Sequence, residues 1–277
     1  MNDRSQWAKL PIRWIHEGGL TRFTDRAVRK VPLGGPLGSD IEVDAEVDVE
    51  VLRNECIAAL RLYLVLCCKT NFKTGLATLT YPQLTRLAKM SRALISRSFK
   101  RLELEKLIAR QPQALKHGTT VKIEGWDDEY AWGKVPKLWL HDGSSDRLLR
   151  LAEFNYCKAS LDALKVLIAI LAYRDRSRAG IATLSYDRLS QITGVARYRV
   201  ADAITKLYDM ELISFRQGDY RDLNPMDRTN RYLVRGLGSY WPVEDAAEDM
   251  ATTQLRPSKP PKDALEAAID FMDKSSQ

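Results

Sequence analysis

Two stretches of this 277-residue chain decide its fold, TLTYPQLTRLAKMSRALISRSFKRLELEKLI (78–108) and TLSYDRLSQITGVARYRVADAITKLYDMELI (183–213). They align at an offset of 105 residues with at most one shift, and the similarity begins just before them, in GLATLTY (75–81) and GIATLSY (180–186). Similarity at a fixed offset indicates that a structural unit occurs more than once. The chain is therefore predicted to use one module twice.

A second similarity lies upstream of each stretch. WAKLPIRWIHEGG (7–19) returns as WGKVPKLWLHDGS (132–144), at an offset of 125 residues. The two tryptophans seven apart, with a proline between them, predict that each segment is an extended strand that covers the core of its module. The difference between the two offsets indicates an insertion in the first copy, around 24–50, whose glycines and prolines predict a loop and whose alternating acids predict an edge-like strand. The expected divisions are a first domain (1–131), a second domain (132–240) and an acidic, proline-containing flexible tail (241–277).

Each copy has the same predicted order of elements. Apolar residues at helical spacing predict a long first helix, a short strand follows, and Thr80 or Ser185 is placed to cap the next helix. A turn, a third helix, a strand, a polar loop and a return strand complete the order. The expected ranges are 49–69, 81–89, 92–104, 107–110 and 120–123 in the first copy and 160–174, 186–193, 196–210, 212–216 and 231–234 in the second.

This order resembles the winged helix-turn-helix superfamily, including its MarR-like and its phage or plasmid replication-protein branches. The resemblance is carried by T-L-[ST]-x-x-x-L, a turn, a basic helix and L-x-x-x-x-L-I, which occur once in each copy. It implies a mainly α fold with small β-hairpins (α+β), built as two tandem winged-helix domains from an internal duplication. Tandem winged helices further resemble plasmid and phage replication initiators, although the two halves of the commonest plasmid initiators differ markedly, whereas these are alike.

The charge of the chain is unevenly distributed. The formal net charge is only +7, but residues 40–50 contain six acids and no base, and the tail contains eight acids and four bases. The rest of the chain carries 39 basic and 22 acidic residues. A body this basic predicts a polyanionic partner, with nucleic acid the leading candidate. The alternative is a soluble basic protein without such a partner.

The third helix of each copy is the predicted DNA-reading element, because the second helix of a helix-turn-helix enters the major groove. Arginine can donate two hydrogen bonds to guanine, and Ser, Thr and Tyr suit phosphate or base contacts. The alternative for any one of these side chains is a solvated helix surface. The predicted buried face is Ile95, Phe99 and Leu102 in the first copy and Val200, Ile204 and Leu207 in the second.

The predicted DNA-binding residues come from these helices and from the wings. In the first copy they are Ser91, Arg92, Ser96, Arg97, Lys100, Arg101, Arg110 and Lys116. In the second copy they are Arg197, Tyr198, Arg199, Thr205, Lys206, Arg221, Arg228 and Arg231. The second wing also contains Asp219, Asp222 and Asp227, so the alternative is that parts of it fold back on the protein.

The motifs of several enzyme classes are missing from the sequence. There is no GxxxxGK[ST] phosphate loop, no HExxH and no CxxC. His16 and His141 occupy matching positions, and a structural role is favoured over metal ligation. The acids of 40–50 are interpreted as solvent-facing, with metal binding or a mimic of DNA charge as alternatives. We therefore expect no catalytic residue, metal or cofactor, and interpret the four cysteines as reduced thiols.

The sequence predicts a cytoplasmic protein that is associated with the nucleoid or a plasmid and has no membrane partner. MNDRSQWAKLP lacks the apolar region of a signal peptide, and the longest apolar stretches, 57–68 and 164–173, are too short to span a bilayer.

In the tail, RPSKPPK is interpreted as a linker. The amphipathic stretch at 265–272 could contact a host replication protein, or be a frayed end or an internal strap.

The function expected from these features is sequence-specific binding of double-stranded DNA without enzymatic activity. One chain is expected to span two half-sites about one helical turn apart. Because the modules follow one another in one chain direction, we expect direct or imperfect repeats, and a homodimer would add an inverted arrangement. The favoured role is initiation of plasmid or phage replication. The alternatives are a transcriptional regulator of a mobile element or its own operon, and a protein-interaction adaptor.

Overall fold

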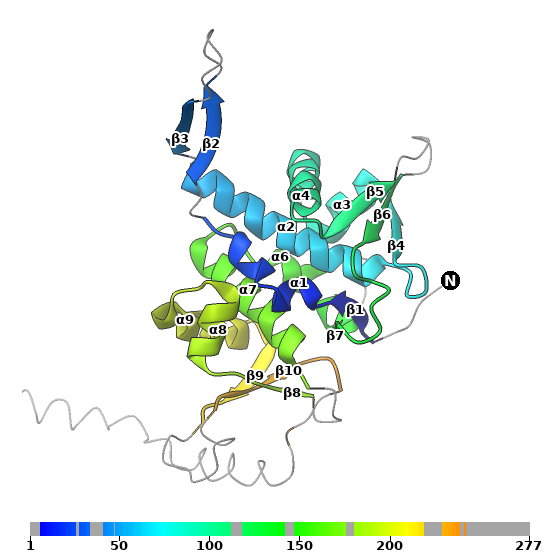
Figure 1. Cartoon of the computed structure of the whole chain (residues 1–277). Coiled ribbons are helices and arrows are strands. Elements are labelled where there is room, and N and C mark those ends of the chain that lie inside the picture. The colour runs from blue at the N-terminus through cyan, green and yellow to red at the C-terminus, as the bar shows by residue number, and fades with distance from the viewer. Residues whose placement is uncertain are drawn as a thin grey trace, which may run out of the picture. The chain divides into compact units, whose positions relative to one another are not determined.

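The fold of the chain is described from a computed structural model, shown in Figure 1. The description covers residues 6–25, 28–33, 41–46, 48–111, 118–141, 147–175, 180–218, 229–238 and 241. The fold is a mixture of helices and short antiparallel strands. Residues 1–239 form one compact unit by their contacts. The predictions for the acidic tail beyond Trp241 lie outside the described residues, as do those for Lys116, Arg221 and Arg228.

The first half of the chain contains an N-terminal segment, a hairpin and a helical module. The segment and hairpin are β1 (Ala8–Pro11), α1 (Arg13–His16), the 3-10 helix η1 (Gly19–Arg22), β2 (Val28–Leu33) and β3 (Ile41–Glu46). The module is α2 (Val49–Lys69), β4 (Leu76–Leu79), α3 (Tyr81–Ala88), α4 (Arg92–Leu104), β5 (Ile108–Gln111) and β6 (Thr119–Ile123). The strands of the module form a sheet in the order β4-β6-β5.

The second half repeats this order without the inserted hairpin. Its N-terminal segment is β7 (Trp132–Val135), α5 (Lys137–Leu140) and α6 (Leu149–Ala152). Its module is α7 (Lys158–Tyr173), β8 (Ile181–Thr183), α8 (Tyr186–Thr193), α9 (Arg197–Asp209), β9 (Ile213–Arg216) and β10 (Arg231–Val234). The sheet order is β8-β10-β9, so the two modules share both the order of their elements and the topology of their sheets.

Most of the predicted ranges agree with the observed elements. Helices at 49–69, 92–104 and 186–193 and the strand at 231–234 match at both ends, and the other module elements differ by one or two residues at an end. The periodicity and cap signals are local, so they could be recognised without tertiary information.

Two predictions about the remaining segments were wrong in part. The Trp-containing segments, expected as extended strands, each form a strand followed by a one-turn helix. The insertion, expected as a loop plus one strand, is a two-stranded hairpin in which Val28 pairs with Glu46 and Leu33 with Ile41. Strand β2 contains Pro32, and a two-stranded hairpin tolerates a proline because each strand has an edge without a ladder partner.

Local signals position the two helices that follow the first strand of each module. Thr80 and Gln83 form a reciprocal capping box at the start of α3, and the Ser185 hydroxyl accepts a hydrogen bond from the backbone N–H of Arg188 at the start of α8. Each such cap satisfies backbone N–H groups that have no partner within the helix. The turn to the next helix has a left-handed residue, Lys89 (φ 49°) in the first module and Gly194 (φ 67°) in the second.

The two long helices lie at the centre of one hydrophobic core that includes residues of both halves. Helix α2 is buried from Cys56 to Cys68 and α7 from Ser160 to Ala172, and the two helices pack against each other. Helices that are apolar on all sides require cover on all sides. Here α4 covers α2 and α9 covers α7. The predicted buried faces of α4 and α9 are confirmed, since all six side chains are at most 1% exposed.

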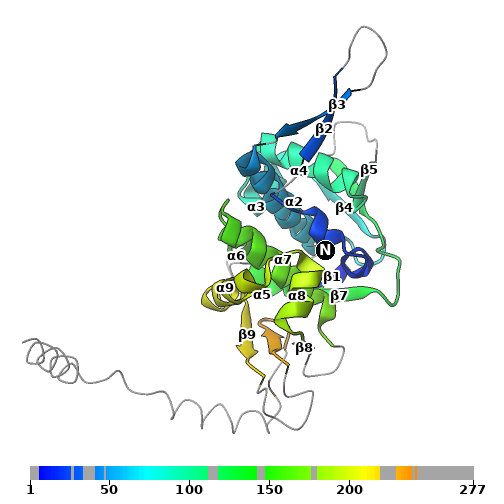
Figure 2. The ribbon, with the colours of Figure 1, turned by 60° about the vertical axis from the view of Figure 1, so that its left-hand side comes forward.

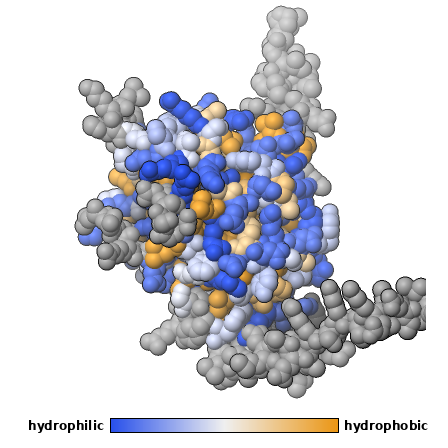
Figure 3. Space-filling model, turned by 180° about the vertical axis from the view of Figure 1, so that it is seen from behind, coloured by the Kyte–Doolittle hydropathy of each residue, from blue (hydrophilic) through white to orange (hydrophobic). Residues whose placement is uncertain are grey.

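The N-terminal segments of the two halves meet in a two-stranded sheet. Strand β1 pairs antiparallel with β7, with Lys9 opposite Lys134, and the rings of Trp7 and Trp132 stack with centroids 5.4 Å apart. In Figures 1 and 2 helices α2, α3 and α4 of the first module lie above this pair, and strands β8 and β9 of the second module lie below it. The face shown in Figure 3 is largely hydrophilic, with its hydrophobic residues in several separate areas.

Candidate nucleic-acid interface

The start of α4 presents basic side chains to solvent. Its first turn is fixed by Ser91, whose hydroxyl accepts a hydrogen bond from the backbone N–H of Leu94 at 3.3 Å. Arg92 is exposed and its guanidinium lies 5.0 Å from the centroid of the Tyr81 ring in α3. The exposed side of α4 therefore begins with a positioned cation.

Two further basic residues continue this face. Arg97 and Lys100 are exposed. The guanidinium of Arg97 is 3.5 Å from the carboxylate of Glu55 in α2. An exposed ion pair of this length contributes little free energy, so the guanidinium can exchange this contact for a phosphate or a base. Arg92, Arg97 and Lys100 together are called the α4 basic face below.

Two other predicted DNA-binding arginines of the first half are held by the protein itself. Arg101 is about one-fifth exposed, forms an ion pair with Glu105 at 3.0 Å and donates a hydrogen bond to the carbonyl of Arg22. Arg110 donates two hydrogen bonds of 2.6 Å to the Glu103 carboxylate. A bidentate pair of this kind is a strong, charge-assisted contact. These two guanidinium groups stabilise the end of α4 and its junction with β5.

The exposed face of α9 differs in composition from that of α4. Arg197 is exposed and forms an ion pair of 2.6 Å with Asp187 in α8. Tyr198 is 79% exposed, and Thr205 is exposed while Lys206 is half-buried. This face therefore combines one paired arginine with an aromatic hydroxyl, unlike the α4 basic face.

Arg199 was predicted to bind DNA together with Arg197 and Tyr198, but its side chain is mostly covered, whereas theirs are exposed. Its side chain is about one-fifth exposed and forms an ion pair with the buried carboxylate of Asp162 in α7. A buried carboxylate is costly unless it has a counter-charge, and Arg199 supplies one. In this structure Arg199 links α9 to α7 beneath the exposed face. Arg231, at the start of β10, and Ser96, in the middle of α4, are both half-buried.

A cluster of buried charges surrounds this ion pair, and sequence reasoning did not anticipate it. Asp25 contacts the ammonium of Lys158 at 3.1 Å and the guanidinium of Arg53 at 3.9 Å. Burial lowers the pKa of Lys165, on α7, to about 8, and burial also raises the pKa of Asp162 above its usual value. The signal in the sequence was present, because Asp162 and Lys165 are three residues apart within an otherwise apolar helix.

Another missed residue, Arg61, connects helices α2 and α3 of the first half to the second half. It lies within α2 and is 2% exposed. Its guanidinium donates hydrogen bonds to the carbonyl of Ala88, at the end of α3, and to the carbonyl of Phe154, after α6. Tyr156 accepts a third bond at 3.3 Å. An arginine in the middle of an apolar run was the only sequence signal for this connection.

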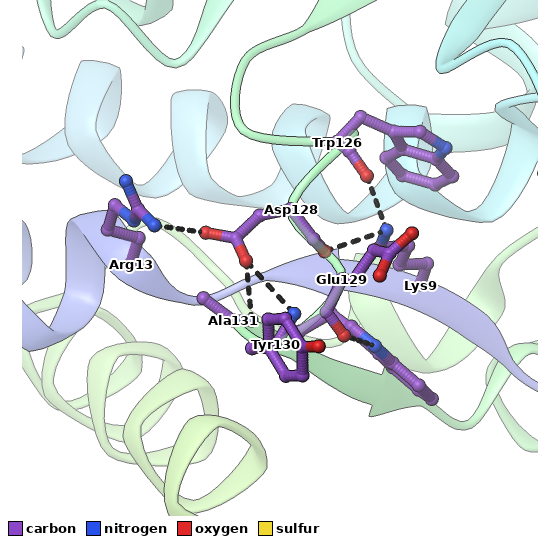
Figure 4. A network of polar contacts seen from close by, with 8 residues as sticks. Lys9, Arg13, Trp126, Asp128, Glu129, Tyr130 and Ala131 are labelled. Carbon is purple, nitrogen blue, oxygen red and sulfur yellow. Dashed lines mark hydrogen bonds and ion pairs between the residues drawn. The ribbon is translucent and has the colours of Figure 1, made fainter.

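A network of polar contacts fixes the segment that joins the two halves, as Figure 4 shows. Asp128 accepts hydrogen bonds of 3.0 Å from the backbone N–H groups of Tyr130 and Ala131 and forms an ion pair of 2.6 Å with Arg13. These contacts, the backbone bonds first, lower the pKa of Asp128. The ammonium of Lys9 donates to the carbonyls of Trp126 and Asp128. The joining segment is therefore tied to β1 and α1.

The histidines and cysteines show no arrangement suited to metal binding in the described part of the chain. No group of three or more His, Cys, Asp or Glu side chains there could hold a metal ion. The ring of His16 lies 4.8 Å from that of Tyr173. All four cysteines are unpaired thiols, and Cys56, Cys67 and Cys68 are buried.

Comparison of the chain with protein-family models, with curated proteins and with solved structures found no match. Among the described helices, none combines the length and the apolar character that crossing a membrane would require.

Proposed function

We propose that the chain is a non-enzymatic protein that binds double-stranded DNA in a sequence-specific manner, through two winged helix-turn-helix modules. In this proposal α4 and α9 are the recognition helices, and the hairpins β5–β6 and β9–β10 are the wings. The residues that contact DNA are those of the α4 basic face together with Arg197 and Tyr198. The protein itself supplies the whole binding surface, without a cofactor.

The observation that carries this proposal is the composition of α4. Its buried face is apolar, and its exposed residues include Arg92, Arg97 and Lys100. The helix is the second of a helix-turn-helix, and a hairpin follows it directly. Recognition helices of this class place their N-terminal residues against base edges in the major groove. An exposed basic face on such a helix is suited to a polyanion.

The test of this proposal replaces Arg92 and Arg97 with alanine in the full chain. The wild-type protein first selects its target from a random pool of DNA duplexes. Each good arginine–guanine contact is worth about 1–3 kcal/mol, so we expect the double variant to bind the selected duplex at least roughly 30-fold more weakly. Equilibrium titration of a labelled duplex measures the effect.

The matched control is Lys73→Ala. Lys73 is an exposed base in the turn before β4. It lies near the Leu76–Lys122 end of the sheet, whereas the wing loop leaves from the Leu79–Thr119 end. Its loss should change the affinity less than twofold. Equal affinities of the wild type and the double variant would eliminate groove docking by α4.

We further propose that the biological role is initiation of replication of a plasmid or phage-like element, with transcriptional regulation as the second candidate. Footprinting on the DNA upstream of the coding region separates the two. An initiator would protect an array of repeats beside an AT-rich stretch, and a regulator would protect an isolated operator. Host replication proteins that contact the acidic tail, and a homodimer, belong to the initiator proposal.

The adaptor alternative is separated by salt dependence. DNA binding that neutralises phosphates should give a linear fall of log K with log salt concentration, with a slope of about 0.9 per phosphate. A flat response would favour a protein partner.

A further inference from the structure

The starting observation is the register of the sheet that joins the two halves. The pairs are Ala8 with Val135, Lys9 with Lys134, Leu10 with Gly133 and Pro11 with Trp132. In the repeat at an offset of 125, Lys134 is the counterpart of Lys9. Each of these lysines therefore pairs with its own counterpart. Ala8 corresponds to Gly133 and Leu10 to Val135, so the repeat converts the pair Ala8–Val135 into the pair Gly133–Leu10.

This register defines a local two-fold axis between Lys9 and Lys134. An antiparallel strand pair has such axes by its geometry, and here the axis also relates the two copies of the repeat. The stacked rings of Trp7 and Trp132 are counterparts as well, 5.4 Å apart with planes 10° from parallel. Both the strand register and the pair of tryptophan rings at the joint thus obey the same two-fold relation.

The contacts away from the joint are reciprocal in the same sense. Segment η1 of the first half contacts α8 of the second half. Segment α6 of the second half contacts α3 of the first half, where the backbone N–H of Leu148 donates to the carbonyl of Leu87 at 3.2 Å. Contacts in which each copy uses the same pair of surfaces are those of an isologous, two-fold interface.

Burial holds this relation in place. Helices α2 and α7 pack against each other, and one hydrophobic core contains residues of both halves. The two modules cannot rotate relative to each other without exposing that core. The relative orientation of α4 and α9 is therefore a property of the folded chain and not of a linker.

We propose that one chain binds one DNA duplex with the two-fold axis of the repeat on a dyad of the DNA, so that α4 and α9 read two half-sites in inverted orientation. This inference rests on the proposed DNA-binding function. The target is a pseudopalindrome, with inverted geometry and two different half-site sequences, because the exposed faces of α4 and α9 carry different side chains. It replaces the direct repeats expected from chain direction alone.

The test maps the order of the elements along the duplex. The protein is the full chain with Cys157→Ser, which leaves only the three buried cysteines. Single cysteines that carry an iron-chelate cleavage reagent are placed at exposed positions. They lie in the first half of each recognition helix (Ala93→Cys or Asp202→Cys) and at the end of the first strand of each hairpin (Gln111→Cys or Gln217→Cys).

Each conjugate is bound to the duplex selected by the wild type, the complex of one chain with one duplex is isolated on a native gel, and the cuts are mapped. The inverted arrangement requires the order hairpin–helix–helix–hairpin or helix–hairpin–hairpin–helix. The centre of the cuts made by the first-half conjugates and the centre of those made by the second-half conjugates should be roughly 10 base pairs apart. A cut order of helix–hairpin–helix–hairpin would overturn the inference and leave the proposed function intact.

The other outcomes are also decisive. If only the conjugates of one half cut the selected duplex, the other half does not contact it, which overturns the shared dyad. A random pool that yields no bound sequence would overturn the proposed function, and the inverted target with it.

Discussion

At the scale of single residues, neighbouring arginines of α9 have different tasks. Arg197 is exposed and contacts only the exposed Asp187 among the ion pairs described, whereas Arg199 is mostly covered and compensates the buried Asp162. They are two positions apart on one helix, about 200° around its axis, so they lie at opposite edges of the buried face of α9. The ion pair with α7 then decides that Arg199 faces inward.

We predict that Arg199→Ala destabilises the fold and that Arg197→Ala does not. Removing one partner of a buried ion pair leaves the other charge uncompensated, so the free energy of unfolding should fall by about 3 kcal/mol. The exposed pair of Arg197 should change it by less than about 1 kcal/mol. Urea denaturation followed by circular dichroism measures both. Equal effects of the two substitutions would contradict the assignment of Arg199 to the interior.

Lys165 should make the stability depend on pH. Burial lowers its pKa from 10.5 to about 8, so between these pH values the unfolded chain holds more protons than the folded chain. The contribution of Lys165 to stability therefore rises as the pH rises through this window. Asp162, Cys56, Asp25 and Arg199 are the charged or titratable groups that act on it.

The corresponding experiment compares Lys165→Met with the wild type from pH 7 to pH 10. The variant should be the more stable protein near pH 7, because it does not bury a charge, and its advantage should shrink as the pH rises. Taking the difference between the two proteins cancels the titration of other groups, among them Cys56. A difference that stays constant with pH would show that Lys165 does not titrate in this window.

At the scale of elements, caps and apolar faces explain why the module forms twice from different residues. Thr80 and Ser185 begin the first helix of each helix-turn-helix, and the turn residue is left-handed in both modules although it is lysine in one and glycine in the other. Lysine tolerates this conformation at some cost in free energy. The helix that follows covers α2 or α7 with three apolar side chains.

We predict that Thr80→Ala lowers the free energy of unfolding by about 1 kcal/mol, because it removes both hydrogen bonds of the Thr80 side chain in the capping box. Thr85→Ala, at an exposed position within the same helix, is the control and should keep or slightly raise the free energy of unfolding, because alanine favours the helix more than threonine does. Chemical denaturation measures the difference. If the two variants lose equal stability, the cap is not the cause.

At the scale of the whole molecule, the N-terminal segment of each half acts as a connector to the other half. Strands β1 and β7 pair with each other, η1 and α6 contact the opposite modules, and Arg61 bonds to residues of both halves. The two lysines that pair at the joint have different side-chain contacts. The ammonium of Lys9 donates to the carbonyls of Trp126 and Asp128, and the ammonium of Lys134 lies over the ring of Trp7. These contacts make the halves mutually dependent.

We predict that residues 6–239 unfold in one cooperative transition. A fragment that contains only 132–241 should be largely unfolded, because α7 would lose the cover that α2 provides to its apolar side and α8 would lose its contact with η1. Coincident urea transitions by tryptophan fluorescence and far-ultraviolet circular dichroism would support this for the full chain. Two separate transitions, or a fragment with native-like hydrogen-exchange protection, would contradict it.

Features of the fold that depend on residues close to one another in the sequence could be predicted, whereas contacts between residues distant in the sequence could not. Helix periodicity, the caps at Thr80 and Ser185 and the buried triads of α4 and α9 arise from residues within a few positions of one another, so the order of elements and the α4 basic face could be predicted. The pairing of Lys9 with Lys134, the inward turn of Arg199 and the hydrogen bonds of Arg61 join residues distant in the chain. Only the tertiary structure decided these, because they depend on which surfaces become buried when the two halves close on one core.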